Sequence, residues 1–163
     1  MPGLTPAWGA VLAEAASVCL ESQGHPAQVE LRVDGSFEET FVLERLRISE
    51  QMRNAYRHDE RTTENGAYGV ALLAVCRLME RTVILQSWQG TGFDYFLAPE
   101  GEDQFQESIL LEISGIRRGT AGAIRGRVRE KIVQMQTHSP FSMERGLIAI
   151  VEFSRPLLRV VKP

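Results

Sequence analysis

Two short apolar segments, each containing one carboxylate, constrain the fold most strongly. Residues 93–97 read Phe-Asp-Tyr-Phe-Leu and residues 109–114 read Ile-Leu-Leu-Glu-Ile-Ser, so each is apolar enough to form a buried strand. A carboxylate within a buried strand is costly unless it is paired, hydrogen-bonded or bound to a cation. If these strands are successive in one sheet, Asp94 and Glu112 converge, and we expect them to bind one divalent cation. The alternative is that both side chains point outward from edge strands into solvent.

The composition is that of an ordinary globular protein. The 163 residues are 44% hydrophobic and 24% charged, which predicts a single domain spanning residues 1–163. The longest apolar runs are too short to span a bilayer, and residues 1–23 lack the basic start of a signal peptide, so we expect a cytoplasmic protein with no membrane contact. Cys19 and Cys76 are expected to be buried free thiols, which suits that compartment. The three histidines are far apart in sequence and do not predict a zinc site.

Charge is distributed unevenly along the chain. The net charge of −3 excludes a protein that is basic throughout. The basic residues that follow Glu112 are nevertheless clustered, and they predict a local basic face able to hold a nucleic-acid backbone. Their alternative role is a solvated helix face with acidic partners elsewhere. They are Arg117, Arg118, Arg125, Arg127, Arg129 and Lys131.

The N-terminal third predicts a helix followed by a hairpin. Residues 4–22 suit a helix that Thr5 caps, with Pro6 in its first position. Apolar and polar residues alternate over 28–33, as in a half-buried strand. Asp34-Gly35 predicts a tight turn, and residues 37–46 can return as the partner strand. Residues 49–57 suit a short helix.

The remaining two thirds predict an α+β (or α/β) fold with a mixed central sheet. A helix over 64–81 is apolar on nearly every side, so we expect it to be buried, with Leu73 in the core. A helix over 120–136 carries one apolar face, and Gly122 and Gly126 on it permit close packing. The expected strands are 82–88, 93–97, 107–114 and 146–153, with 156–161 as an edge strand. An acidic loop is expected over 98–106.

This order, with Asp94 on the second strand and Glu112 on the third, resembles the PD-(D/E)xK nuclease superfamily. The superfamily has a restriction-endonuclease-like αβββαβ core, and its usual motif is an Asp followed by Glu-x-Lys on the next strand. Here Ser114 stands where the lysine is expected. The resemblance covers roughly residues 60–153 and implies that residues 1–58 add a helix and hairpin to that core.

The resemblance also implies roles for individual residues. Asp94 and Glu112 would bind Mg²⁺ or Mn²⁺, and Glu64 matches an acidic residue that many members carry on the first core helix. The lysine positions the attacking water, and some members supply it from the next helix, which makes Lys131 the candidate here. The alternative for Lys131 is a surface lysine paired with Glu130 or solvent. Arginines cannot readily release a proton, so they would hold substrate phosphates instead. The candidates for that role are Arg117, Arg118 and Arg125.

Three functions remain open. The first is a divalent-metal-dependent nuclease acting on nucleic-acid phosphodiesters. The second is a catalytically inactive nuclease-fold subunit that serves as an interaction module in a bacterial multi-protein assembly such as a defence complex; the acidic net charge and the absent motif lysine favour it. The third is a domain that binds a small ligand or peptide and has no nuclease ancestry. A protein partner or homo-oligomer is expected in addition. The distance between the Asp94 and Glu112 carboxylates, and whether Lys131 reaches them, discriminates between the first function and the others.

Two further features have alternative explanations. Trp88 and Tyr95 can stack on a base or sugar, or can be core and rim aromatics. The glycine-containing segment 115–122 can bind a phosphate at a helix N-terminus, although a plain strand-to-helix turn is favoured because no lysine-hydroxyl pair accompanies it.

Overall fold

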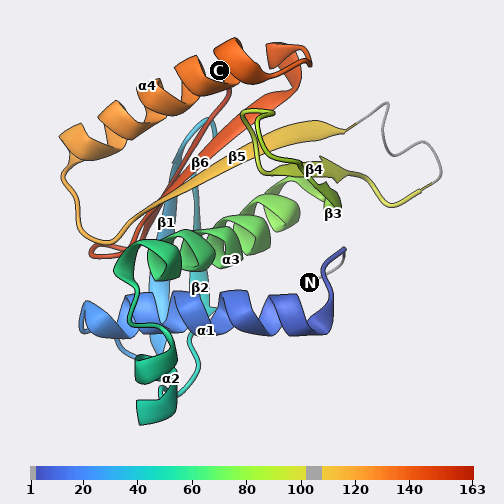
Figure 1. Ribbon diagram of the computed structural model, residues 1–163. Coiled ribbons are helices and arrows are strands. Elements are labelled where there is room, and N and C mark those ends of the chain that lie inside the picture. Colours follow the sequence, from blue (N-terminus) through green and yellow to red (C-terminus); the bar gives the residue numbers. More distant parts are fainter. Residues whose placement is uncertain (1–2, 102–107) are drawn as a thin grey trace.

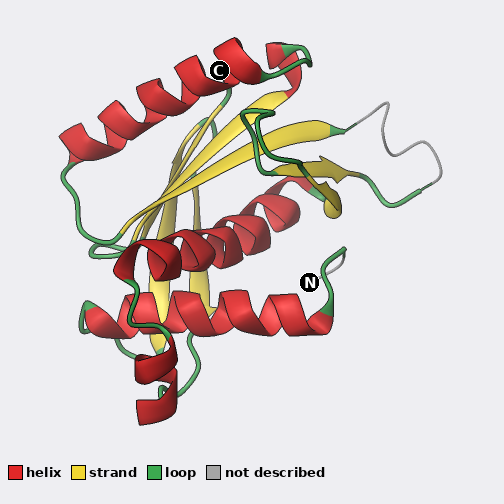
Figure 2. Ribbon diagram, viewed as in Figure 1, coloured by secondary structure: helices red, strands yellow, loops and turns green. Residues whose placement is uncertain are grey.

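The computed structural model of the protein describes residues 3–101 and 108–163, which form a seven-stranded mixed sheet with helices on both faces (Figure 1). The helices are α1 (Pro6–Ser22), α2 (Glu50–Ala55), α3 (Asp59–Met79) and α4 (Ala121–His138), with a short 3-10 turn at Met143–Arg145. The strands are β1 (Gln28–Gly35), β2 (Glu39–Glu44), β3 (Thr82–Gln86), β4 (Tyr95–Ala98), β5 (Ile109–Ile116), β6 (Gly146–Glu152) and β7 (Leu157–Val161). The secondary structure is coloured by type in Figure 2.

The sheet runs in the order β2-β1-β7-β6-β5-β4-β3. Pairs β1/β7 and β5/β6 are parallel, and the other neighbours are antiparallel. α4 covers one face, while α3 and then α1 are stacked on the other (Figure 1). The predicted α+β class is confirmed, as is the order helix, three strands, helix, strand from α3 to β6.

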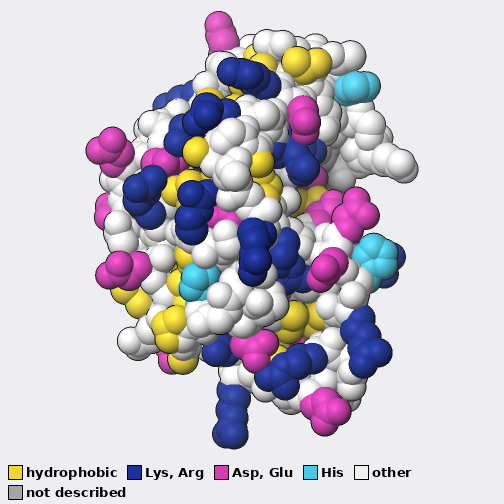
Figure 3. Space-filling view, turned by 90° about the vertical axis from the view of Figure 1, so that its left-hand side faces the viewer, with side chains coloured by type: hydrophobic (Ala, Val, Ile, Leu, Met, Phe, Trp, Pro, Cys, Tyr) yellow, Lys and Arg dark blue, Asp and Glu magenta, His cyan; other side chains and the backbone are white. Residues whose placement is uncertain are grey.

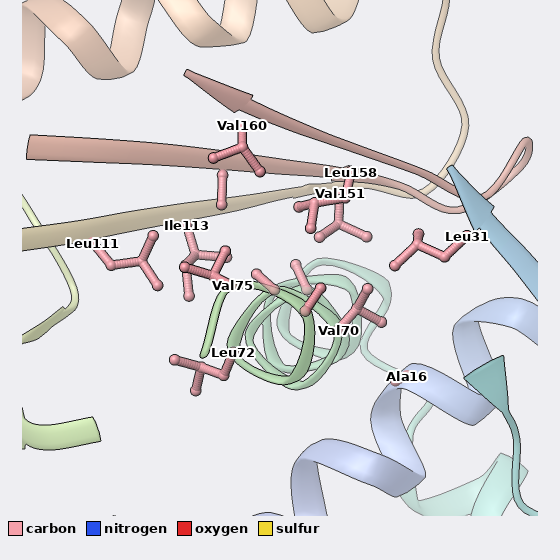
Figure 4. Close-up of a cluster of buried hydrophobic side chains, with 14 of the residues drawn as sticks. Ala16, Leu31, Val70, Leu72, Val75, Leu111, Ile113, Val151, Leu158 and Val160 are labelled. Carbon is pink, nitrogen blue, oxygen red and sulfur yellow. The ribbon is translucent and has the colours of Figure 1, made fainter. Parts of the chain in front are cut away.

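Alternation along the central strands divides the apolar side chains between two cores. Leu111 and Ile113 of β5 face α3, whereas Leu110 faces α4. The α3-side core is the larger one, and Figure 4 views it along the α3 axis, with sheet side chains on one side of the helix and Ala16 of α1 on the other. The α4-side core is smaller and rich in aromatics. Both cores meet at β5, so Glu112 on this strand lies between two packed layers.

Several predicted boundaries are wrong, for identifiable reasons. β1 continues through Asp34 and Gly35, so the hairpin turns at residues 36–38 rather than at Asp34-Gly35. Asp34 stays in the strand because Arg159 of β7 binds its carboxylate, with Nε 2.5 Å from Oδ1. β7 is not an edge strand, since β1 pairs with it in parallel. Residues 102–106 of the expected acidic loop lie outside the described residues, as does Glu107, the first residue of the expected strand 107–114.

Two expectations about the helices are also wrong. α3 is buried between the sheet and α1, as predicted, but Leu73 on it is 52% exposed. The helix lies beside the open end of the sheet, and this leaves one side uncovered. Gly122 and Gly126 do not permit close packing of another element, because a Cβ at Gly122 would approach only Thr120 Oγ1 (3.5 Å) and one at Gly126 would have no neighbouring element within 4 Å. Both cysteines are free, as expected, although Cys76 is only half-buried. No helix in the described part of the chain is long and apolar enough to cross a membrane.

Candidate active site

The two predicted carboxylates meet where β4 joins β5. Glu112 belongs to β5, and the alternation that turns Leu111 and Ile113 toward α3 turns Glu112 toward α4. Asp94 immediately precedes β4 rather than lying within it. Its N–H donates to Leu111 O (2.9 Å), and its side-chain Oδ2 accepts from Ile113 N (2.7 Å). The Asp94 side chain thus binds a backbone N–H at the edge of β5, just before β4 begins.

The carboxyl groups of Asp94 and Glu112 are neighbours whose titrations influence each other, and the pKa values of both are raised. Burial raises the pKa of Glu112 to about 8, and the neighbouring charge of Asp94 contributes to that rise. Burial also raises the pKa of Asp94, although the Ile113 N–H and the Tyr68 hydroxyl oppose the shift. Ionisation of both carboxyl groups at once is therefore disfavoured.

Lys131 of α4 contacts this pair. Its Nζ lies 2.5 Å from Glu112 Oε1 and donates to Gln134 Oε1 (3.0 Å), and the Gln134 amide donates to Glu112 Oε1 (3.1 Å). The predicted approach of Lys131 to the carboxylates is therefore observed. The alternative pairing with Glu130 is wrong, because Glu130 binds Arg127.

Tyr68 of α3 connects a third acidic residue to the pair. Its hydroxyl lies 2.9 Å from Asp94 Oδ1 and 3.1 Å from Glu64 Oε1. Burial raises the pKa of Tyr68, so it remains a neutral donor. Tyr68 was not predicted from the sequence. Its spacing from Glu64, one helical turn, is the signal that would have suggested it.

A cleft of about 430 Å³ opens beside the carboxyl pair. One wall is the first turns of α3 and is acidic, with Asp59, Glu60 and Glu64. The opposite wall carries Lys131 and Arg127 of α4. The cleft therefore has one acidic wall and one basic wall, and the β5 backbone at Ile113–Gly115 lies between them.

The predicted substrate-binding arginines are only partly placed at this cleft. Arg117 lines it and pairs with Asp59 (3.1 Å). Arg118 instead donates to Gln23 (3.1 Å), and Arg125 is exposed on α4 outside the residues that line the cleft. Arg127, which was not singled out, does line it.

Arg127 is anchored by Ser114 of β5 and by Glu130 of its own helix. Its Nη1 donates to Ser114 Oγ (2.7 Å), and its Nε lies 3.1 Å from Glu130 Oε2. Ser114 thus binds a cationic side chain that reaches back from α4. Figure 3 views the end of the molecule where α4 begins, and it shows Lys and Arg side chains over much of this face with acidic side chains between them.

The aromatic candidates have different environments. Tyr95 is fully buried and its hydroxyl accepts from Trp8 Nε1 (3.4 Å), so it is a core residue. Trp88 is 59% exposed on the β3–β4 hairpin, with its ring 6.3 Å from that of Phe96. Only Trp88 remains available for stacking.

The donor set suits a hard cation that keeps part of its water shell. Among the described residues, no three acidic, histidine or cysteine side chains converge as a closed metal site. Mg²⁺ commonly binds through one or two carboxylates and completes its coordination with water and substrate phosphate. Asp94, which is half-buried, and Glu112, which is buried, supply two carboxyl groups of this kind, and burial raises the pKa of both, so a bound cation would stabilise their ionised forms.

Comparisons with known proteins give no family assignment. No protein-family model matches the chain, and neither a curated protein nor a solved structure matches it. The function of the protein has therefore to be inferred from the chemistry of the site itself.

Proposed function

We propose that the protein is a divalent-metal-dependent nuclease that hydrolyses phosphodiester bonds in the cleft beside Asp94 and Glu112. The observation that carries this proposal is the contact of half-buried Asp94 with buried Glu112, with the Lys131 ammonium 2.5 Å from Glu112. The resemblance of the αβββαβ order to the PD-(D/E)xK superfamily supports it.

Each residue has a physical role in this reaction. Asp94 and Glu112 would hold Mg²⁺ or Mn²⁺, which supplies a more acidic water and neutralises charge on the phosphate. The water oxygen bonds to phosphorus, the bond from phosphorus to the leaving sugar oxygen breaks, and that oxygen takes up a proton while the water loses one. Lys131 places a fixed positive charge where negative charge builds up on the phosphate. Arg127 is held by Ser114 and Glu130, so it can bind a phosphate without losing much side-chain entropy.

The test is cleavage of labelled single- and double-stranded DNA and RNA with Mg²⁺ or Mn²⁺. Glu112→Ala and Lys131→Ala should each reduce the rate by roughly a hundredfold or more. Lys162→Ala is the matched control, because Lys162 lies near the Phe37 ring and outside the residues that line the cleft. Loss of cleavage in Glu112→Ala with full activity in Lys131→Ala would retain the nuclease and remove Lys131 from the mechanism.

One observation favours the inactive subunit as a second candidate. The α3 wall of the cleft presents Glu60 and Glu64, which repel a polyanion when no cation is bound. If the wild type cuts none of these substrates with either metal and still folds cooperatively, the second candidate replaces the first.

A further inference from the structure

The main chain of Asp94 is held on both sides, but its side chain is not oriented by these bonds. The Asp94 N–H donates to Leu111 O (2.9 Å), and the Asp94 carbonyl oxygen accepts from Ser87 N (2.7 Å). These two bonds set the position of the Cα atom. The second side-chain torsion of an aspartate is broad and roughly two-fold, so it does not fix the carboxylate plane by itself. Contacts to the two carboxylate oxygens therefore decide how the group points.

Each carboxylate oxygen of Asp94 has a donor, and the two donors come from different elements. Oδ2 accepts from Ile113 N of β5 (2.7 Å), and Oδ1 accepts from the Tyr68 hydroxyl of α3 (2.9 Å). With the Ile113 bond alone, the carboxylate could still turn about that one contact, whereas the second bond fixes its plane. An ionised carboxylate has about four lone-pair sites, so both oxygens keep the capacity to bind a cation.

The Tyr68 ring is held by packing and not only by its hydroxyl. It meets the ring of Tyr95 edge to face, with the ring centroids 5.6 Å apart and the planes at 84°. Tyr95 is itself fully buried, and its hydroxyl accepts from Trp8 Nε1 of α1 (3.4 Å). The Tyr68 ring should therefore stay in place when its hydroxyl is removed.

The Tyr68 hydroxyl has a second acceptor in Glu64, whose Oε1 lies 3.1 Å away. A hydroxyl has a single hydrogen, so it cannot donate fully to both carboxylates. The contact with Asp94 is the shorter one, and it is part-buried, whereas the contact with Glu64 is exposed to water. A hydrogen bond is stronger where the local dielectric is lower, so the Tyr68 hydrogen is donated mainly to Asp94.

We propose that Tyr68 is a positioning residue that holds the Asp94 carboxylate in the orientation that receives a divalent cation together with Glu112. This role rests on the metal site of the proposed function and adds to it a residue from α3. Carboxylates that bind metals are themselves hydrogen-bonded, and loss of such a partner typically lowers metal affinity by roughly 10–100-fold. Tyr68 acts through Asp94 and contacts neither the cation nor the substrate.

The first test is calorimetric titration of Tyr68→Phe with Mn²⁺, because this variant keeps the ring and removes only the hydroxyl. Its Kd for Mn²⁺ should be roughly tenfold or more above that of the wild type. Tyr56→Phe is the matched control, since it removes a tyrosine hydroxyl that donates to Val11 O (3.2 Å) outside the residues that line the cleft, and it should bind Mn²⁺ as the wild type does. Equal Kd values for Tyr68→Phe and the wild type, or a wild type that binds no Mn²⁺, overturn the proposal.

The second test is amide hydrogen exchange followed by NMR on the protein without metal. In Tyr68→Phe the Ile113 amide should exchange several-fold faster, because the freed carboxylate holds it less well. The Asp94 amide should keep its wild-type rate, since its acceptor is the main-chain oxygen of Leu111. Glu64→Ala should leave both rates unchanged, because the bond to Asp94 and not the contact with Glu64 orients the carboxylate. Faster exchange of both amides in Tyr68→Phe would mean that Tyr68 supports the strands as a whole, and it would overturn the positioning role.

Cleavage assays on the same variants separate this role from the nuclease itself. If the wild type binds Mn²⁺ but cuts no nucleic acid, and Tyr68→Phe binds Mn²⁺ more weakly, the nuclease fails and the positioning role stands. If the wild type cuts and Tyr68→Phe binds Mn²⁺ equally well, the nuclease stands and the positioning role is overturned. Thermal melts establish that each variant folds. A Tyr68→Phe variant without a cooperative melt also contradicts the proposal, because the ring packing alone should hold this part of α3.

Discussion

Glu112 and Glu152 are both buried glutamates on neighbouring strands, but their environments differ. Burial acts to raise the pKa of Glu152, but hydrogen bonds from Ser154 and from the N–H groups of Gly119 and Arg155 outweigh it and leave the pKa below its usual value. Glu112 instead has Asp94 beside it and a raised pKa. Glu152 is therefore a satisfied structural carboxylate, whereas Glu112 has a raised pKa even with Lys131 and Gln134 beside it.

This difference predicts opposite effects of removing each charge. The folded pKa of Glu112 is about 8 against an ordinary 4.5. Between these values the folded protein keeps a proton that the unfolded chain has lost, so this residue's contribution to stability falls as pH rises. Glu112→Gln cannot ionise and should raise Tm by several degrees at pH 8 but little near pH 4.5. Scanning calorimetry across this range measures it, and a Tm lowered equally at all pH values would contradict it. Glu152→Gln, the control, should lower Tm at neutral pH because the carboxylate acceptors are lost.

The same carboxyl pair predicts that Mn²⁺ binding releases a proton. A cation held by both Asp94 and Glu112 replaces the proton on Glu112, so close to one proton should be released at pH 7 and progressively fewer above pH 8. Calorimetric titrations in buffers of different ionisation enthalpy count the protons. Asp94→Asn should abolish binding, while Glu144→Gln, an exposed acidic residue outside the site, should not. Equal binding by Asp94→Asn and the wild type would remove the metal site.

The sequence predicted some of these residues and not others. Asp94 and Glu112 stand out because a carboxylate in an apolar strand demands a partner, and Lys131 because it borders an apolar helix face. Tyr68 was not predicted, and Arg127 was named only as a member of the basic run, since their contacts depend on how α3 and α4 cross the sheet. Arg118 was predicted to bind substrate from its position in a basic run, but a run of charge does not indicate which side chains turn into a cleft.

At the scale of the element, α3 illustrates what apolar periodicity leaves open. Residues 70–75 read Val-Ala-Leu-Leu-Ala-Val, so no polar position marks the side that faces away from the sheet. The helix was correctly expected to be buried, because a helix of this kind needs cover on nearly every side. Leu73 is exposed because the sheet ends at β2 and does not cover that side of the helix. Where the sheet ends depends on the order of its strands, which the helix sequence does not indicate.

Adjacent leucines on α3 should therefore respond differently to the same substitution. Leu72 is 0% exposed, and Leu72→Asp should prevent folding because an unpaired buried carboxylate costs several kcal/mol, a large part of the stability of a domain. Leu73→Asp should remain soluble and unfold cooperatively with a midpoint close to that of the wild type. Urea denaturation followed by circular dichroism compares the two. Similar behaviour in both variants would contradict the assignment of the exposed side.

At the scale of the whole molecule, the N-terminal third is continuous with the rest. β1 pairs in parallel with β7, and the Asp34–Arg159 ion pair joins residues 125 positions apart. α1 packs closely on α3, since the absent Cβ of Gly69 would lie 2.9 Å from Leu12 O. The helix and hairpin were themselves predictable from local pattern. Their attachment was not, because a parallel pairing between distant segments has no signature in either segment alone.

This continuity predicts that the chain beginning at Arg57 cannot fold by itself. The cut leaves the cap of α3 at His58 intact, but it removes α1 from α3 and exposes the β7 edge and the apolar face that α1 covers. The lost burial should exceed the marginal stability of a domain of this size. The fragment should show no cooperative urea transition, whereas mixing it with residues 1–56 should restore one, because the two fragments can reform the β1/β7 pair and the α1/α3 contact. A fragment that unfolds cooperatively alone would show that residues 57–163 form an autonomous core and that the first third is an addition to it.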